Sequence, residues 1–175
     1  MRLAIEREWD GRPCADARLH GEVRLSLPSG GPQTRGLEIQ ASLPHQHTPR
    51  VPEQPPHTRV ADLYEYDVVE CFLVGEGGRY LEVELGAGGH FLVLSFDAPR
   101  VLADAHEDLD PVLRFEEGTS RWRSTLTLPE DFLPTGVCAV NAFVIAGGHH
   151  LAWHPVPGTR PDFHQPGCFP RVSLG

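Results

Sequence analysis

Three glutamates in two neighbouring strand-like segments are the strongest candidates for a functional site. Glu70 lies in an alternating run at residues 64–74, and Glu82 and Glu84 lie in a second run at 80–85. One phase of each run is purely apolar: Val69, Cys71 and Leu73 in the first, and Leu81, Val83 and Leu85 in the second. Successive side chains of a strand point to opposite faces. If the runs pair as a hairpin with both apolar phases on the core, the three glutamates share the other face.

Neighbouring carboxylates repel one another across paired strands, so this face needs a partner or solvent. One interpretation is a surface that binds hydroxyl groups or a cation, because hydrogen bonds to an ionised carboxylate are strong. The alternative is a solvated outer face with salt bridges to Arg79, Arg121 or Arg123. A glycosidase also needs one carboxyl group with a raised pKa, and the sequence shows no apolar pocket that would raise it. We therefore expect binding rather than catalysis, and assign no catalytic residue.

A second group of polar side chains lies near the C-terminal end of the sequence. Its members are His149, His150, His154, Asp162 and His164. Imidazole and carboxylate groups suit zinc, iron or nickel, which makes Asp162 and His164 candidate metal ligands. No HExxH motif accompanies them, so the alternative is that Asp162 orients His164 and both fix the C-terminal segment. No cofactor is expected.

The charge distribution excludes several classes of partner. The net charge is −9, and residues 62–84 carry seven acidic side chains against one arginine. The acidic run at 104–117 matches no EF-hand pattern and is expected to be a solvated loop that passes into a strand after Pro111. This acidic protein has no basic stripe for nucleic acid or an anionic membrane. Four separated cysteines and no apolar leader predict a reduced, cytoplasmic protein without a disulfide framework.

The elements that must position these groups are short strands. Glycine (18 residues) and proline (17) are abundant, which favours turns over long helices. Strands are predicted at 3–8, 22–27, 37–43, 64–74, 80–85, 91–96, 122–128, 137–145 and 151–154, with a turn at 28–32 and a helical turn at 129–131. The fold class is therefore all-β, a two-sheet antiparallel sandwich. We expect one domain, 1–175, with a proline-rich loop at 44–60 and an irregular tail at 155–175.

Several blocks of this sequence are similar to an uncharacterised protein family of bacteria and animals. They are Leu63-Tyr64-x-x-Asp67-Val68-Val69-Glu70-x-Phe72, Tyr80-Leu81-Glu82-Val83-Glu84, Asn141-x-Phe143, Trp153 and Asp162-Phe163-His164. That family resembles the family 9 carbohydrate-binding modules and the DOMON-like sandwiches. The resemblance spans residues 9–169 and is most specific in the hairpin and the tail.

In those sugar-binding modules two aromatic residues sandwich the sugar ring and a glutamate bonds its hydroxyls. The resemblance therefore implies Tyr64 and Trp153 as platforms and Glu70 as the hydrogen-bond acceptor. Tyr64 replaces the usual tryptophan, and His150 stands where an asparagine is expected. The predicted ligand-binding set is Tyr64, Glu70, Glu82, Glu84, His150 and Trp153.

The leading hypothesis is a non-catalytic binder of a small polar ligand, such as a carbohydrate. One alternative is an intracellular enzyme that uses Glu70, Glu82 and His164, with or without a metal. The other is a protein-interaction module whose acidic face meets a basic partner.

Overall fold

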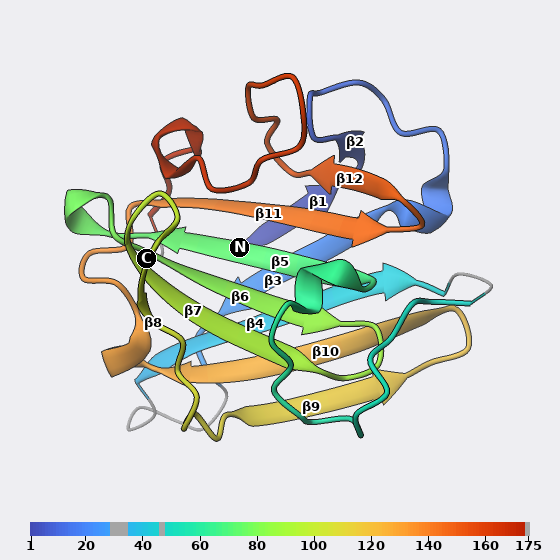
Figure 1. Ribbon diagram of the computed structural model, residues 1–175, viewed down its shortest axis with the longest axis horizontal. Helices are drawn as coiled ribbons and strands as arrows, with labels where there is room; N and C mark the ends of the chain where they lie inside the picture. The colour runs from blue at the N-terminus through green and yellow to red at the C-terminus, as the bar shows by residue number, and fades with distance from the viewer. Residues whose placement is uncertain (29–34, 46–47, 174–175) are drawn as a thin grey trace.

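The computed structural model describes residues 1–28, 35–45 and 48–173. Its strands form two antiparallel sheets that pack face to face as a β-sandwich (Figure 1). The five-stranded sheet runs in the order β1 (Arg2–Ile5), β3 (Gly21–Ser26), β4 (Gly36–Pro44), β10 (Arg121–Pro129) and β9 (Val112–Glu117). The seven-stranded sheet runs in the order β2 (Arg7–Glu8), β12 (His149–Ala152), β11 (Ala139–Ala146), β5 (Val68–Val74), β6 (Tyr80–Gly86), β7 (Phe91–Ala98) and β8 (Val101–Asp104).

The predicted all-β sandwich is confirmed, and most predicted strands are present within one or two residues. The first predicted strand is divided, because β1 pairs with β3 in one sheet and β2 with β12 in the other. Two details were wrong: residues 63–65 form a 3-10 helix, so the strand begins only at Val68, and the strand β8 was not predicted. A 3-10 helix at Glu130–Phe132 matches the predicted helical turn. The predicted turn at 28–32 lies mostly outside the described residues.

The main core fills the space between the two sheets. The apolar phases of β5 and β6 both point into it, as predicted, together with the phase of β10 that contains Trp122 and Leu126. The register pairs Glu70 with Glu84 and Phe72 with Glu82 across the hairpin. Both runs therefore place their glutamates on the outer face of the seven-stranded sheet.

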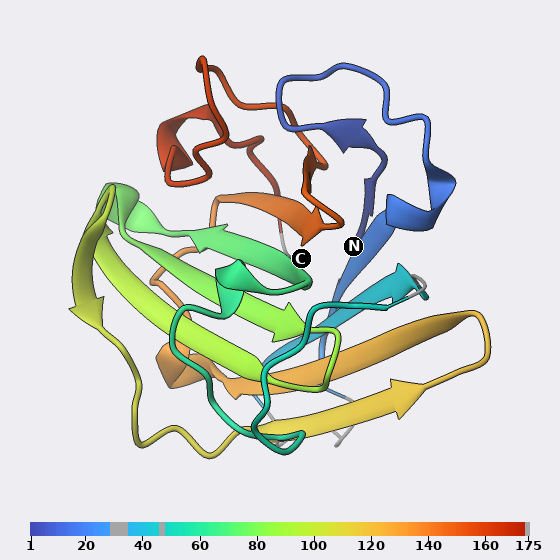
Figure 2. The same cartoon turned by 45° about the vertical axis from the view of Figure 1, so that its right-hand side comes forward.

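That outer face is covered rather than solvated. A second apolar cluster lies on it, in which Phe163 and Phe169 of the tail pack against Phe72 and Phe143. A smaller cluster contains Val60 and Leu63 from the segment before β5. In the views of Figures 1 and 2 the tail crosses above β5 and β11, and the segment before β5 crosses the lower part of the same sheet. As a result, every residue of β5 and β6 is buried.

Candidate functional site

The floor of the candidate site consists of carboxyl groups from two neighbouring strands. Glu70 projects from β5, and Glu82 and Glu84 project from β6. One carboxylate oxygen from each lies within 4.8 Å of the others, and their exposed fractions are 2%, 4% and 1%. The interpretation of these glutamates as a solvated face is therefore wrong. They also present no exposed acidic surface to a basic partner.

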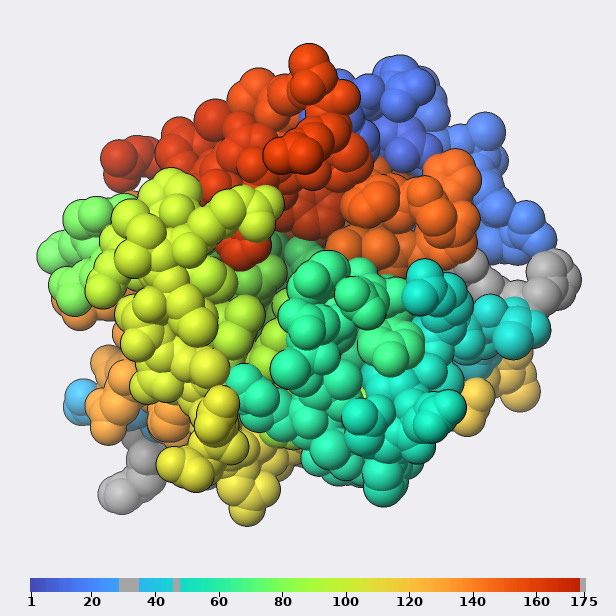
Figure 3. All heavy atoms as spheres, viewed as in Figure 1, coloured from blue at the N-terminus to red at the C-terminus, as the bar shows by residue number. Residues whose placement is uncertain are grey.

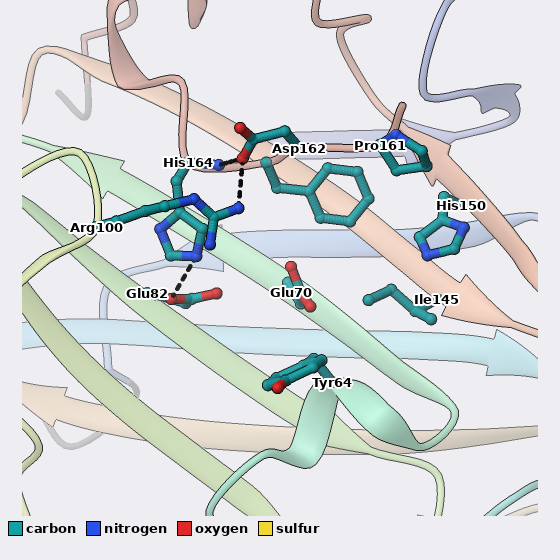
Figure 4. A pocket seen from close by; sticks show the side chains of 10 residues that line it. Tyr64, Glu70, Glu82, Arg100, Ile145, His150, Pro161, Asp162 and His164 are labelled. Carbon is teal, nitrogen blue, oxygen red and sulfur yellow. Dashed lines mark hydrogen bonds and ion pairs between the residues drawn. The ribbon is translucent and has the colours of Figure 1, made fainter. Parts of the chain in front are cut away.

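A pocket of about 260 Å³ opens above this floor. Figure 4 shows Glu70 and Glu82 pointing into it from below, with the tail residues opposite them. In the space-filling view of Figure 3, a hollow lies between the tail, the segment around residue 64 and the segment around residue 100. The residues that line the pocket are Tyr64, Glu70, Glu82, Arg100, Ile145, His150, Pro161, Asp162, Phe163 and His164.

His164 forms the part of the wall nearest to Glu82. Its Nε2 lies 3.8 Å from the Glu82 carboxylate, and its Nδ1 lies 2.8 Å from the Tyr80 hydroxyl. That hydroxyl accepts a hydrogen bond from the backbone N–H of Arg100, so its own proton is free to be donated to Nδ1. A neutral imidazole that accepts at Nδ1 carries its proton on Nε2. The His164 N–H therefore faces Glu82.

Asp162 connects the tail to the turn between β7 and β8. Its carboxylate accepts hydrogen bonds from the Arg100 guanidinium at 2.7 Å and from the backbone N–H of His164 at 3.2 Å. Burial acts to raise the Asp162 pKa, but these hydrogen bonds outweigh it and the pKa is lowered. Asp162 thus fixes the backbone of His164, while Tyr80 orients its ring.

Burial shifts the pKa values of the glutamates and of His164 in opposite directions. Loss of water raises the pKa of Glu70 and Glu84 well above the usual value, and repulsion from neighbouring carboxylates raises it further. Burial raises the Glu82 pKa to about 8, although the charge of Arg100 opposes this. The same loss of water lowers the pKa of His164 to about 4. The site therefore contains carboxyl groups with raised pKa values, which could not be predicted from the sequence.

The structure brings most of the predicted site residues together. Tyr64 stands at the rim with half of its surface exposed, and half-buried His150 lines the opposite side. Glu84 belongs to the same cluster of carboxyl groups but does not itself line the pocket. Trp153 packs against the core between the sheets, away from the pocket.

Four lining residues were missed in the sequence: Arg100, Ile145, Pro161 and Phe163. Arg100 lies in the turn after β7 with a positive φ of 61°, and Phe163 stacks on Phe143 with ring centroids 3.9 Å apart. The Pro99-Arg100 turn signal was available, but no spacing rule connects it to a tail residue 62 positions later.

Comparison with curated proteins identifies a group of animal relatives. The human UPF0462 protein C4orf33 is 32% identical over 175 residues, covering 94% of this chain and 83% of the human protein. The rat homologue is 31% identical over 176 residues, covering 94% and 84% of the two chains. The Danio rerio homologue is 29% identical over 185 residues, covering 99% and 89%. No family model matches the chain.

Among solved structures, a Bacteroides uniformis protein described as a putative carbohydrate-binding protein has a similar fold. The TM-score is 0.67, at 16% identity, over 97% of this chain and 84% of that one. This likeness concerns the sandwich alone. Within the described residues, no helix has the length and apolar character that a membrane crossing requires.

Proposed function

This chain belongs to the UPF0462 family, and we propose that its pocket binds a small, neutral, polyhydroxylated ligand, with a monosaccharide as the leading candidate. The observation that carries the proposal is that Glu70 and Glu82 lie at the floor of a pocket whose rim holds an exposed tyrosine. Carboxyl groups bond hydroxyls as acceptors, and as donors when protonated. An aromatic face packs on the apolar face of a sugar ring.

The size and charge of the pocket limit the kinds of ligand that it can bind. A volume of about 260 Å³ lies below the range of roughly 300–1,000 Å³ that drug-sized ligands occupy. It therefore suits about one sugar ring. Two carboxyl groups in the floor and a third in the same cluster disfavour phosphorylated or acidic ligands. The similar fold of the Bacteroides protein supports a carbohydrate over other polyols.

A panel of neutral monosaccharides, measured by ligand-observed NMR and calorimetry, tests this proposal. We expect at least one sugar to bind, and Tyr64→Ala to weaken it about 2- to 10-fold, because aromatic packing contributes roughly 0.5–1.5 kcal/mol. Tyr66→Ala is the matched control, since Tyr66 belongs to the same segment and does not line the pocket. Absence of binding across the panel, or an equal loss in both variants, would contradict the proposal.

A second candidate function follows from the convergence of Glu70, Glu82 and His164 on one pocket. Such a set suits proton transfer on a bound sugar, for example opening of its ring. In that reaction one group removes the proton of the anomeric hydroxyl, another delivers a proton to the ring oxygen, and the bond between the anomeric carbon and the ring oxygen breaks.

Exchange NMR between the two anomers distinguishes catalysis from binding. An enzyme would accelerate exchange of a bound sugar, and Glu82→Gln would reduce that acceleration by about 10²- to 10⁴-fold, the usual contribution of an acid or base. A simple binder would leave the exchange rate at its value in buffer. That result would reject the catalytic candidate while leaving the binding proposal intact.

A further inference from the structure

The cluster of Glu70, Glu82 and Glu84 has more acidic groups than nearby basic side chains can neutralise. The three carboxyl groups are each at least nine-tenths buried and lie within 4.8 Å of one another. Within the described residues, the imidazole of His164, whose Nε2 lies 3.8 Å from the Glu82 carboxylate, is the single basic side chain at ion-pair distance from any of them, and its lowered pKa leaves it neutral near pH 7. The guanidinium of Arg100 is occupied by Asp162. Buried charges without compensation are costly, so the cluster needs either protons or a cation.

Glu84 provides the independent sign that a ligand is missing from this arrangement. Its Oε2 atom is fully buried and has no hydrogen-bond partner. The side chain faces Glu70 directly across the hairpin, so it points into the cluster. An unpartnered buried polar atom costs roughly 1–3 kcal/mol, and native structures contain few of them.

We propose that Glu70, Glu82 and Glu84 together hold one hard divalent cation. Carboxylate oxygens are the ligands preferred by Mn²⁺, Mg²⁺ and Ca²⁺. Oxygens on opposite sides of a Ca²⁺ ion lie about 5 Å apart, given bond lengths of roughly 2.3–2.6 Å. The observed limit of 4.8 Å is compatible with one shared ion. Because Glu70 and Glu82 also line the pocket, the ion has access from solvent and can complete its coordination with water.

The proposed cation ligands differ from the metal ligands suggested by the sequence. The sequence suggested Asp162 and His164 as ligands, but Asp162 is bonded to Arg100 and the Nδ1 atom of His164 to Tyr80. Among the described residues, the glutamates are the one group whose ligand atoms converge at metal-binding distances. The cation site and the proposed sugar site share Glu70 and Glu82, whereas Glu84 lies outside the pocket lining, and cation binding can be measured with no sugar present.

Electron paramagnetic resonance tests the site with Mn²⁺ alone, after the protein has been stripped with EDTA. The signal of free Mn²⁺ should fall as one ion binds per chain. Glu84→Gln preserves the shape of the side chain and should weaken binding at least tenfold. Glu65→Gln should bind as the wild type does, because Glu65 is exposed and is not a member of the buried cluster. No binding by the wild type, or equal binding by Glu84→Gln, would overturn the proposal.

A measurement on the unaltered protein covers the case in which Glu84→Gln fails to fold. Bound Mn²⁺ broadens the NMR signals of nearby nuclei. We expect broadening at Tyr64 and at the residues of β5 and β6 that flank the glutamates. Broadening confined to the exposed acids of the segment 104–117 would instead identify weak surface binding and would reject the buried site.

Discussion

Replacing Phe72 by alanine is expected to lower the free energy of unfolding by about 3–5 kcal/mol, the usual cost of removing a large buried aromatic side chain. Phe72 is completely buried on the outer face of the seven-stranded sheet. Its ring contacts four others: Tyr80, Phe143, His164 and Phe169, with centroid distances of 6.1, 5.4, 5.7 and 5.7 Å. The variant would therefore leave a cavity beneath the tail, at the point where the pocket wall is supported.

Urea denaturation measures this effect. Phe72→Leu should recover part of the lost stability because it refills most of the volume with apolar atoms. Leu102→Ala is a control, since Leu102 is half exposed on β8. A loss below about 1 kcal/mol in Phe72→Ala would mean that the tail does not form a second core with this sheet.

In EDTA, the titration of Glu82 should cost the protein about 2 kcal/mol of stability between pH 6.5 and pH 8. The folded state holds protons on buried carboxyl groups that the unfolded chain releases near its usual pKa of about 4.5. Glu82, with a folded pKa of about 8, therefore adds stability at low pH that disappears as the pH rises. One proton corresponds to a slope of about 1.4 kcal/mol per pH unit.

The window is chosen to exclude the opposing effect of His164. Its folded pKa of about 4 lies below the unfolded value, so its stabilising contribution grows between pH 4 and 6.5 and is then complete. Stability that is constant or rises from pH 6.5 to 8 would contradict the expectation. Glu82→Gln should reduce the slope, because the amide does not titrate, while Glu70 and Glu84 keep their raised pKa values.

Alternation along two strands was sufficient to predict the floor of the site. The inward phases of β5 and β6 are apolar without exception, so the period of two placed Glu70, Glu82 and Glu84 on one face. The sequence did not show that this face is covered. The covering residues belong to an irregular tail, which has no periodicity from which its position can be inferred.

Trp153 shows where a resemblance misled and a simpler rule was available. It follows Leu151 by two residues, and Leu151 points into the core between the sheets. The same alternation therefore directs Trp153 inward rather than toward the pocket. His150 has the opposite phase and does line the pocket. Tyr64 reaches the rim from a 3-10 helix rather than from the predicted strand.

The late position of the tail in the sequence has a consequence for synthesis on the ribosome. Tyr80 and His164 are 84 residues apart, so the strands that carry the glutamates leave the ribosome long before the segment that closes over them. Until then Glu70 and Glu82 lack the tail residues that enclose them in the folded protein. The energetic cost of removing water from these carboxyl groups is thus deferred to one of the last steps of folding, when the tail docks.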